Sequence, residues 1–306
     1  MTANPWFRRA FFGAFLAAFV AASCGAVAAP MAAVDVQGLW DYGKPELSEQ
    51  RFRQALETAA GDDVLILQTQ IARSYGLRRQ FAQAAAILDS IAQAAGRAGP
   101  EVRARYQLEL GRTLVSATHK RTEITPEARD RARSAYTLAA QIAREGRLDD
   151  LAIDALHMLP FVDTDGASQL KWNQQALDIV STSTQPAAKR WETMLRNNTA
   201  YALHQLGRHE EALALFQANI EPTARKGQAD KTRIAHWMVA WTLRALNRTD
   251  EALAIQLRLE RENDADKTPD PYVFEELTLL YQARNEARRV EHYAARLKAS
   301  RPAGSD

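Results

Sequence analysis

The sequence contains few of the residues that form crosslinks or turns. It has one cysteine, 14 glycines and 11 prolines in 306 residues. A single cysteine excludes a disulfide framework and any metal site with several cysteine ligands. Glycine and proline together make up about 8% of the chain, against roughly 12% in an average protein. This shortage argues against a turn-rich all-β fold and favours helices.

The sequence also lacks the short motifs of the common enzyme classes. It contains no G-x-S-x-G, no H-E-x-x-H, no G-x-x-x-x-G-K-[ST] and no G-x-G-x-x-G. Its histidines are scattered, and the acidic stretch at 163–166 lacks the distal ligands of a calcium loop. We therefore predict no catalytic residue, no cofactor and no metal. An enzyme with an unfamiliar site stays open as an alternative.

The first 28 residues have the pattern of a secretory signal peptide. Arg8 and Arg9 precede an apolar run over 10–22, and small residues follow as far as an expected cleavage site after Ala28. The apolar run is shorter than the roughly 20 residues that span a bilayer. The pattern predicts a bacterial protein that is periplasmic or secreted.

Two other interpretations of this segment stay open. Cys24, which follows Ala21, Ala22 and Ser23, resembles the acylated cysteine of the bacterial lipobox. Lipidation there would anchor the protein to the outer membrane. The arginine pair also resembles a twin-arginine export motif, which would carry a folded protein across the membrane.

The net charge argues against nucleic acid as a partner. The +2 of the whole chain comes from the two arginines of the leader, and 37 basic and 37 acidic side chains follow Ala28. Acids alternate with bases along the basic stretches, for example over 120–133, so no positive stripe forms. We expect no nucleic-acid binding, and membrane association only through a lipid on Cys24.

One helical pattern recurs through the remainder of the chain. In 195–222, apolar residues recur at helical spacing as far as Leu206, and Gly207 then ends the helix. A second apolar series follows and closes at Pro222. The pattern predicts a hairpin of a first and a second helix. Six such hairpins are expected, at 64–95, 101–145, 148–183, 195–222, 229–262 and 270–300.

These hairpins resemble tetratricopeptide repeats (TPRs), in which W-x-x-L-G-x-x-Y and A-x-x-x-F mark the two helices. The resemblance covers about residues 50–300, although the spacings between units are longer than the 34 residues of the family. It implies an all-α, right-handed superhelical solenoid of about six hairpins. The expected organisation is a signal peptide at 1–28, an irregular N-terminal arm at 29–50, the solenoid at 51–300 and a disordered tail at 301–306.

The resemblance also implies a binding surface, because the first helices of TPR hairpins line a concave groove. Trp, Tyr and Arg, which dominate binding hot spots, recur at these positions. Trp237 and Trp241 have an alternative role in core packing, and the full basic set of the family's carboxylate clamp is missing. The predicted groove residues are Arg73, Arg112, Asn197, Tyr201, His204, Trp237, Trp241, Arg244 and Glu275, with His157 in the third unit.

The predicted function is that of an exported, non-catalytic TPR protein that binds another envelope protein or a peptide in this groove. The alternative is an outer-membrane lipoprotein, acylated on Cys24, that serves as a structural part of an envelope assembly.

Overall fold

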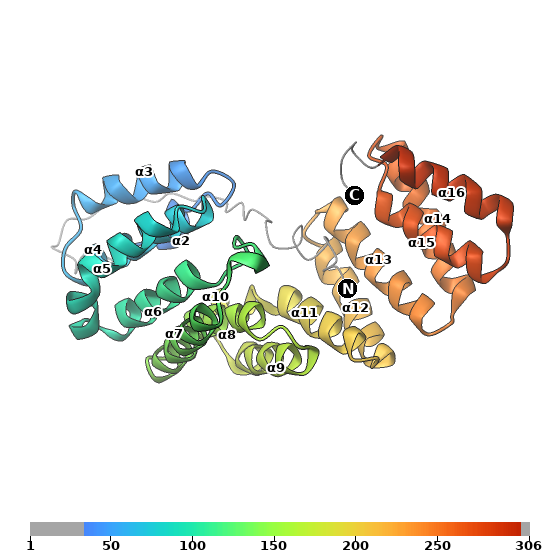
Figure 1. The fold of residues 1–306 in the computed structure, drawn as a ribbon. Coiled ribbons are helices and arrows are strands. Elements are labelled where there is room, and N and C mark those ends of the chain that lie inside the picture. Colours follow the sequence, from blue (N-terminus) through green and yellow to red (C-terminus); the bar gives the residue numbers. More distant parts are fainter. Residues whose placement is uncertain (1–33, 301–306) are drawn as a thin grey trace, which may run out of the picture. The chain divides into compact units, whose positions relative to one another are not determined.

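A computed structural model describes residues 34–300, and the predictions for the signal peptide, Cys24 and the tail lie outside these residues. Every regular element between residues 34 and 300 is helical. No helix in this part of the chain is long and apolar enough to cross a membrane. The described residues form two compact units (Figure 1), unit 1 with 34–164 and 178–189, and unit 2 with 165–177 and 190–300.

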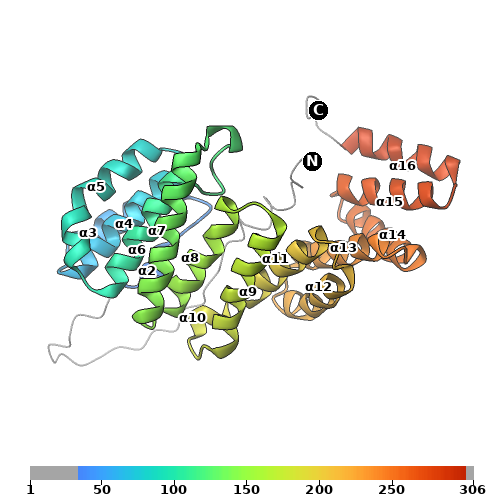
Figure 2. The same cartoon turned by 60° about the horizontal axis from the view of Figure 1, so that its bottom comes forward.

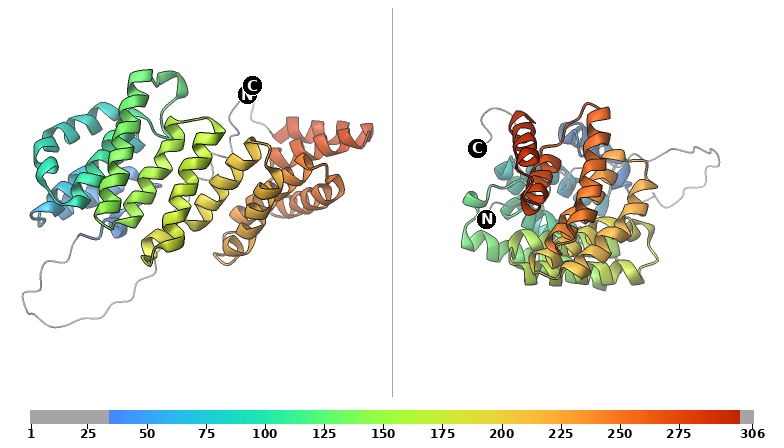
Figure 3. Two further views of the ribbon diagram at one scale, coloured as in Figure 1. Left: turned by 90° about the horizontal axis from the view of Figure 1, so that it is seen from below. Right: turned by 90° about the vertical axis from the view of Figure 1, so that its right-hand side faces the viewer.

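Unit 1 is a series of antiparallel helices, each packed on the next from α3 to α8. The green helices of this unit lie side by side in Figure 3. Helix α4 also contacts α6, and α6 contacts α8, so the first helices of the hairpins adjoin one another. The elements are α2 (Val36–Leu39), α3 (Pro45–Leu56), α4 (Asp62–Leu77), α5 (Phe81–Arg97), α6 (Pro100–Leu114), η1 (Arg121–Glu123), α7 (Pro126–Glu145), α8 (Asp149–Val162) and α10 (Pro186–Lys189).

Unit 2 repeats the arrangement, with consecutive contacts from α11 to α16. Figure 2 shows its last hairpin, in which α15 and α16 lie side by side. The first helices α13 and α15 are again in contact. Helix α9 (Gly166–Thr182) begins in unit 2 and ends in unit 1. The other elements are α11 (Glu192–Gln205), α12 (His209–Ala224), α13 (Ala229–Ala245), α14 (Thr249–Ala265), α15 (Pro271–Ala283) and α16 (Ala287–Ser300).

The predicted helix–turn–helix pattern is confirmed. Six corresponding positions of the hairpins lie on the second helices α5, α7, α9, α12, α14 and α16. Four of these residues are alanines with no exposed surface, which lets neighbouring helices approach closely. The six positions are Ala84, Ala132, Ser168, Ala212, Ala252 and Val290.

The turns inside the three hairpins from α11 to α16 share one geometry. Gly207, Asn247 and Asn285 take positive φ angles between a first and a second helix. In each case the next residue donates its N–H back to a carbonyl near the end of the first helix, for example Arg208 to Leu203 at 2.9 Å. Glycine and asparagine tolerate the left-handed region, so the sequence encodes these turns locally.

The N-terminal arm is more regular than the sequence pattern predicts. Residues 36–39 form α2, and α3 begins at Pro45 within the segment expected to be irregular. The indole of Trp40 is buried against Phe52 and Ile71, and its Nε1 donates to Gln70 Oε1 at 3.0 Å. The segment is therefore fixed by contacts with α3 and α4, which helical periodicity does not reveal.

Gly111 on α6 gives a sharp test of the packing in unit 1. A Cβ at this position would lie 2.5 Å from Cε1 of Tyr136, whose ring is fully buried. We expect Gly111→Ala to destabilise unit 1 by about 2 kcal/mol, because the ring has no space to move. Gly96→Ala is the control, since a Cβ at Gly96 on α5 meets nothing within 4 Å. Equal urea midpoints for the two variants would contradict the prediction.

Candidate functional site

The predicted groove residues fall into two groups, one in each unit. Arg73 and Arg112 lie on α4 and α6 of unit 1, and His157 lies on α8. All the others lie on α11, α13 and α15, the first helices of unit 2. The structure thus places every predicted residue on a first helix, and we describe each group by itself.

In unit 2, five ring side chains form a continuous series that we call the aromatic face: Tyr201, His204, Trp237, Trp241 and Tyr272. Trp241 lies at the centre, with ring centroids 3.4 Å from His204, 5.9 Å from Tyr201 and 5.8 Å from Trp237. These three neighbours stack within 18° of the Trp241 plane. Trp237 then meets Tyr272 edge-on at 6.5 Å. The rings link α11, α13 and α15 across the unit.

The two tryptophans of this face differ in exposure. Trp237 is only 4% exposed, and its Nε1 donates to the carbonyl of Tyr272 at 3.2 Å. Trp241 is half-buried, and its indole N–H makes no hydrogen bond within residues 34–300. The core-packing interpretation therefore fits Trp237, whereas Trp241 has both a ring edge and a hydrogen-bond donor available.

The aromatic face carries little net charge. Arg244 donates to both carboxylate oxygens of Glu276, at 2.7 and 2.8 Å, so its charge is matched. Burial, with help from His209 and Arg244, lowers the pKa of His204 to about 3, which keeps the imidazole neutral near pH 7. Glu275 is exposed, one turn of helix from Tyr272. The half-buried Asn197 amide makes no hydrogen bond to any described residue.

In unit 1 the predicted arginines belong to a buried ionic cluster. Arg112 pairs with Glu109 and with Asp154, each at 2.5 Å, and Arg73 lies 3.8 Å from the other oxygen of Asp154. Burial tends to raise the pKa of Asp154, but Arg112 and Arg73 outweigh it and hold the carboxyl below its usual range. His157 is 6% exposed beside these groups. Arg112 and His157 thus lie in the interior of unit 1, where they support the fold.

Several residues of these two groups do not stand out in the sequence. Glu109 lies one turn before Arg112, a spacing that predicts an ion pair on a helix. Asp154 and Glu276, however, reach their partners from another helix, and no sequence pattern identifies them. Trp40 and Tyr42 lie in the predicted arm, yet their stacked rings are 4.7 Å apart and adjoin Arg73.

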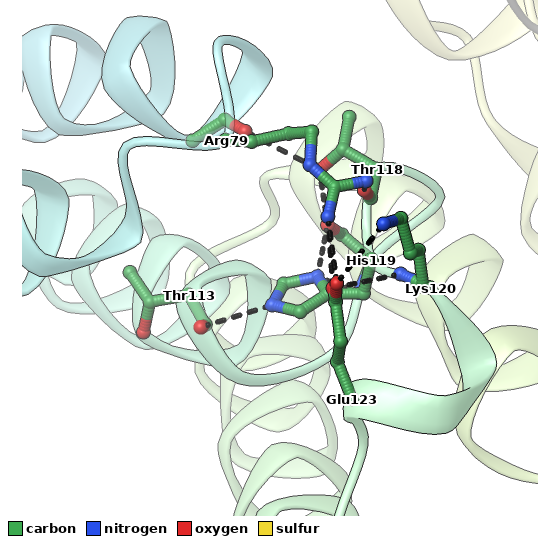
Figure 4. Close-up of polar contacts among 8 residues, drawn as sticks. Arg79, Thr113, Thr118, His119, Lys120 and Glu123 are labelled. Atoms are coloured by element: carbon green, nitrogen blue, oxygen red, sulfur yellow. Dashed lines mark hydrogen bonds and ion pairs between the residues drawn. The ribbon is translucent and has the colours of Figure 1, made fainter.

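A second polar cluster fixes the long connection between α6 and α7 (Figure 4). Arg79 donates to the Thr118 carbonyl and to Glu123. His119 stacks on Phe81, with ring centroids 3.8 Å apart. Burial lowers the pKa of His119, and its Nδ1 accepts from the Ser116 N–H at 3.1 Å. These contacts are internal to unit 1 and hold the connection against the α4–α5 turn.

Two surface hollows lie away from the predicted residues. One is lined by α6 and α7, including Leu110 and Leu138, and has a volume of about 360 Å³. The other lies beside Gly227 and Arg233 in unit 2, at about 510 Å³. Within residues 34–300 no group of three or more His, Cys, Asp or Glu residues is placed to hold a metal ion.

Comparison with known proteins identifies the fold. No protein-family model and no curated protein matches the chain. Among solved structures, apo RapI is similar with a TM-score of 0.69 and 12% identity, over 89% of this chain and 74% of that one. A Rap protein complexed with competence and sporulation factor has a TM-score of 0.52 and 13% identity, over 87% and 73%.

The third similar structure is a signal transduction ATPase with a tetratricopeptide repeat sensor, from Pyrococcus horikoshii. Its TM-score is 0.63 at 11% identity, over 84% of this chain. This chain spans only 40% of that protein. At these identities the likeness shows the fold alone, which is an all-α fold of TPR-like helical repeats.

Proposed function

We propose that this protein is an exported, non-catalytic binding protein that holds a peptide or an extended protein segment on the aromatic face of unit 2. The observation that carries the proposal is the half-buried Trp241. It is stacked between rings from two helices and has an unused indole donor. Aromatic side chains of this kind dominate binding hot spots, because they bring a large contact area and a directed polar group.

The surrounding charges support an uncharged or weakly charged ligand segment. The guanidinium of Arg244 is occupied by Glu276, and the imidazole of His204 is neutral. A ligand on this face would pack apolar side chains on the rings and accept hydrogen bonds from Trp241 and Asn197. A Rap protein of similar fold is solved in complex with competence and sporulation factor, which supports ligand binding by such repeats.

Peptide selection tests this proposal. A phage-displayed library of random dodecapeptides is panned on the full chain, and the selected peptides are measured by fluorescence anisotropy. We expect Trp241→Ala to weaken binding by about tenfold or more, because truncating a hot-spot tryptophan removes most of the local contact energy. Trp172→Ala, a half-buried tryptophan on α9 outside the face, is the matched control. Equal affinities for both variants, with folds intact by circular dichroism, would refute the proposal.

Export and anchoring need a separate experiment. The leader pattern before residue 29 supports transfer to the periplasm, and Cys24 supports the alternative of an outer-membrane lipoprotein. Mass spectrometry of the mature N-terminus, with metabolic labelling by a fatty-acid analogue, decides between them. We expect an N-terminus after Ala28 and no label. A label that disappears in Cys24→Ala would establish the lipoprotein instead.

A further inference from the structure

Arg73 has an unusual hydrogen-bonding state. Its side chain is only 19% exposed, and its guanidinium lies over the stacked rings of Trp40 and Tyr42, at 5.4 and 5.3 Å from their centroids. None of its N–H groups makes a hydrogen bond to a described residue, and its one ion pair, with Asp154, is long at 3.8 Å. A guanidinium carries five donors, and no Arg73 nitrogen is among the fully buried atoms that lack a partner, so these donors remain accessible to a ligand.

Arg78, one residue beyond the end of α4, is a useful comparison for Arg73. Its side chain is 18% exposed, and its guanidinium also lies over a tyrosine ring, 4.4 Å from the centroid of Tyr75. Unlike Arg73, it donates to Glu49 and to the Ser74 carbonyl. Arg73 and Arg78 therefore have nearly the same exposure and the same kind of aromatic support, but only Arg78 donates hydrogen bonds to described residues.

The charges around Arg73 are already balanced. Arg73 and Arg112 face the carboxylates of Glu109 and Asp154, and the remaining neighbour His157 is neutral near pH 7 because its pKa is lowered by burial. An additional carboxylate would leave this largely buried cluster with an excess negative charge, which a low-dielectric site disfavours. What the cluster lacks is a hydrogen-bond acceptor without charge.

The hydroxyl of Tyr42 is a second polar group beside Arg73 that has no partner among the described residues. Tyr42 is half-buried, its ring supports the guanidinium, and its hydroxyl makes no hydrogen bond within the described part of the chain. A carbonyl oxygen beside an N–H, as in a peptide bond, matches an arginine fork next to a hydroxyl. We infer that Arg73 and Tyr42 form a recognition point in unit 1 for an uncharged peptide group, by donation to its carbonyl oxygen.

This inference rests on the proposed peptide binding but concerns the other unit, so the two can fail separately. Those selected dodecapeptides whose binding Trp241→Ala does not weaken are measured against Arg73→Lys, Arg73→Met and Tyr42→Phe. Lysine keeps the charge that balances Asp154 but loses the planar fork, and phenylalanine keeps the stack but loses the hydroxyl. We expect both Arg73 variants to weaken binding by about tenfold, and Tyr42→Phe to weaken it severalfold. Arg78→Lys is the matched control and should leave the affinity unchanged.

The salt arm of the same experiment identifies the chemistry of the ligand group. Raising NaCl from about 0.05 to about 0.5 M should change the dissociation constant less than about twofold, because no net charge is exchanged. A steep salt dependence, with acidic residues or the C-terminus required in the selected peptides, would overturn the inference in favour of a carboxylate ligand. If every selected peptide depends on Trp241 and none depends on Arg73, the inference is also overturned, and the proposed function stands. Failure to select any peptide would refute both.

Discussion

Arg112→Met should destabilise unit 1 by about 3–5 kcal/mol, the largest effect expected of any single substitution described for this protein. The guanidinium of Arg112 is the partner of both Glu109 and Asp154, at 2.5 Å each, and all three side chains are at most 11% exposed. Methionine fills a similar volume but leaves two carboxylates in the interior without their main counter-charge. Hydrogen exchange of the α6 and α8 amides, read by mass spectrometry, measures the loss within unit 1.

Two further variants test whether the loss of stability in Arg112→Met comes from unpaired buried charge. Arg103→Met, at an exposed position of the same helix, should change stability by less than about 0.5 kcal/mol. Replacing the two carboxylates as well, with Glu109→Leu and Asp154→Leu added to Arg112→Met, should restore most of the stability, because an apolar cluster carries no unpaired charge. If Arg112→Met costs no more than Arg103→Met, the cluster is not buried as described.

Acidification should destabilise the same unit through His157, by an amount on the order of 3 kcal/mol. Burial lowers the pKa of His157 to about 4, Asp154 opposes this shift, and Arg112 and Arg73 add to it. The unfolded chain takes up a proton near pH 6.5, whereas folded His157 stays neutral until about pH 4. The contribution of neutral His157 to the free energy of unfolding is therefore fully present above pH 6.5, and it is lost as the pH falls from 6.5 to about 4.

Replacing His157 alone isolates this contribution. In His157→Gln, the difference in unfolding free energy between pH 7 and pH 4 should be smaller than in the wild type by about 2–3 kcal/mol. His292→Gln, at an exposed position on α16, is the control and should follow the wild type. Urea titrations at a series of pH values give these differences. If the unfolding free energies of the wild type and His157→Gln change equally with pH, the prediction is wrong, because folded His157 then takes up its proton as readily as the unfolded chain does.

The helices and their pairing could be predicted because the signals are local. Gly207, Asn247 and Asn285 mark turns by their tolerance of positive φ, and apolar residues at helical spacing mark the faces on either side. The same register placed Tyr201, Trp237 and Trp241 on first helices, where the structure finds them stacked together. The α2 segment was not predicted, because the burial of Trp40 depends on Phe52 and Ile71 rather than on a periodic pattern.

The partners of the arginines in the candidate sites could not be predicted from local sequence patterns. From the sequence, Arg73, Arg112 and Arg244 are equivalent, since each is an arginine on a first helix. The structure distinguishes them by their partners, because Arg244 is held by Glu276, Arg112 by Glu109 and Asp154, and Arg73 by no hydrogen bond to a described residue. An arginine that is hydrogen-bonded to carboxylates of the chain supports the fold, whereas one that has no such bond can donate to a ligand.

The sequence by itself thus determined the helical hairpins, their order and the face of each first helix, because these follow from spacings within a single hairpin. Only the tertiary structure decided which charges are paired. Arg112 meets Asp154 across 42 residues and Arg244 meets Glu276 across 32, so each pair forms only when helices from different hairpins pack together. That packing also leaves the donors of Trp241 in unit 2 and of Arg73 in unit 1 without an acceptor among the described residues, so only the tertiary structure identifies these two side chains as available to a ligand.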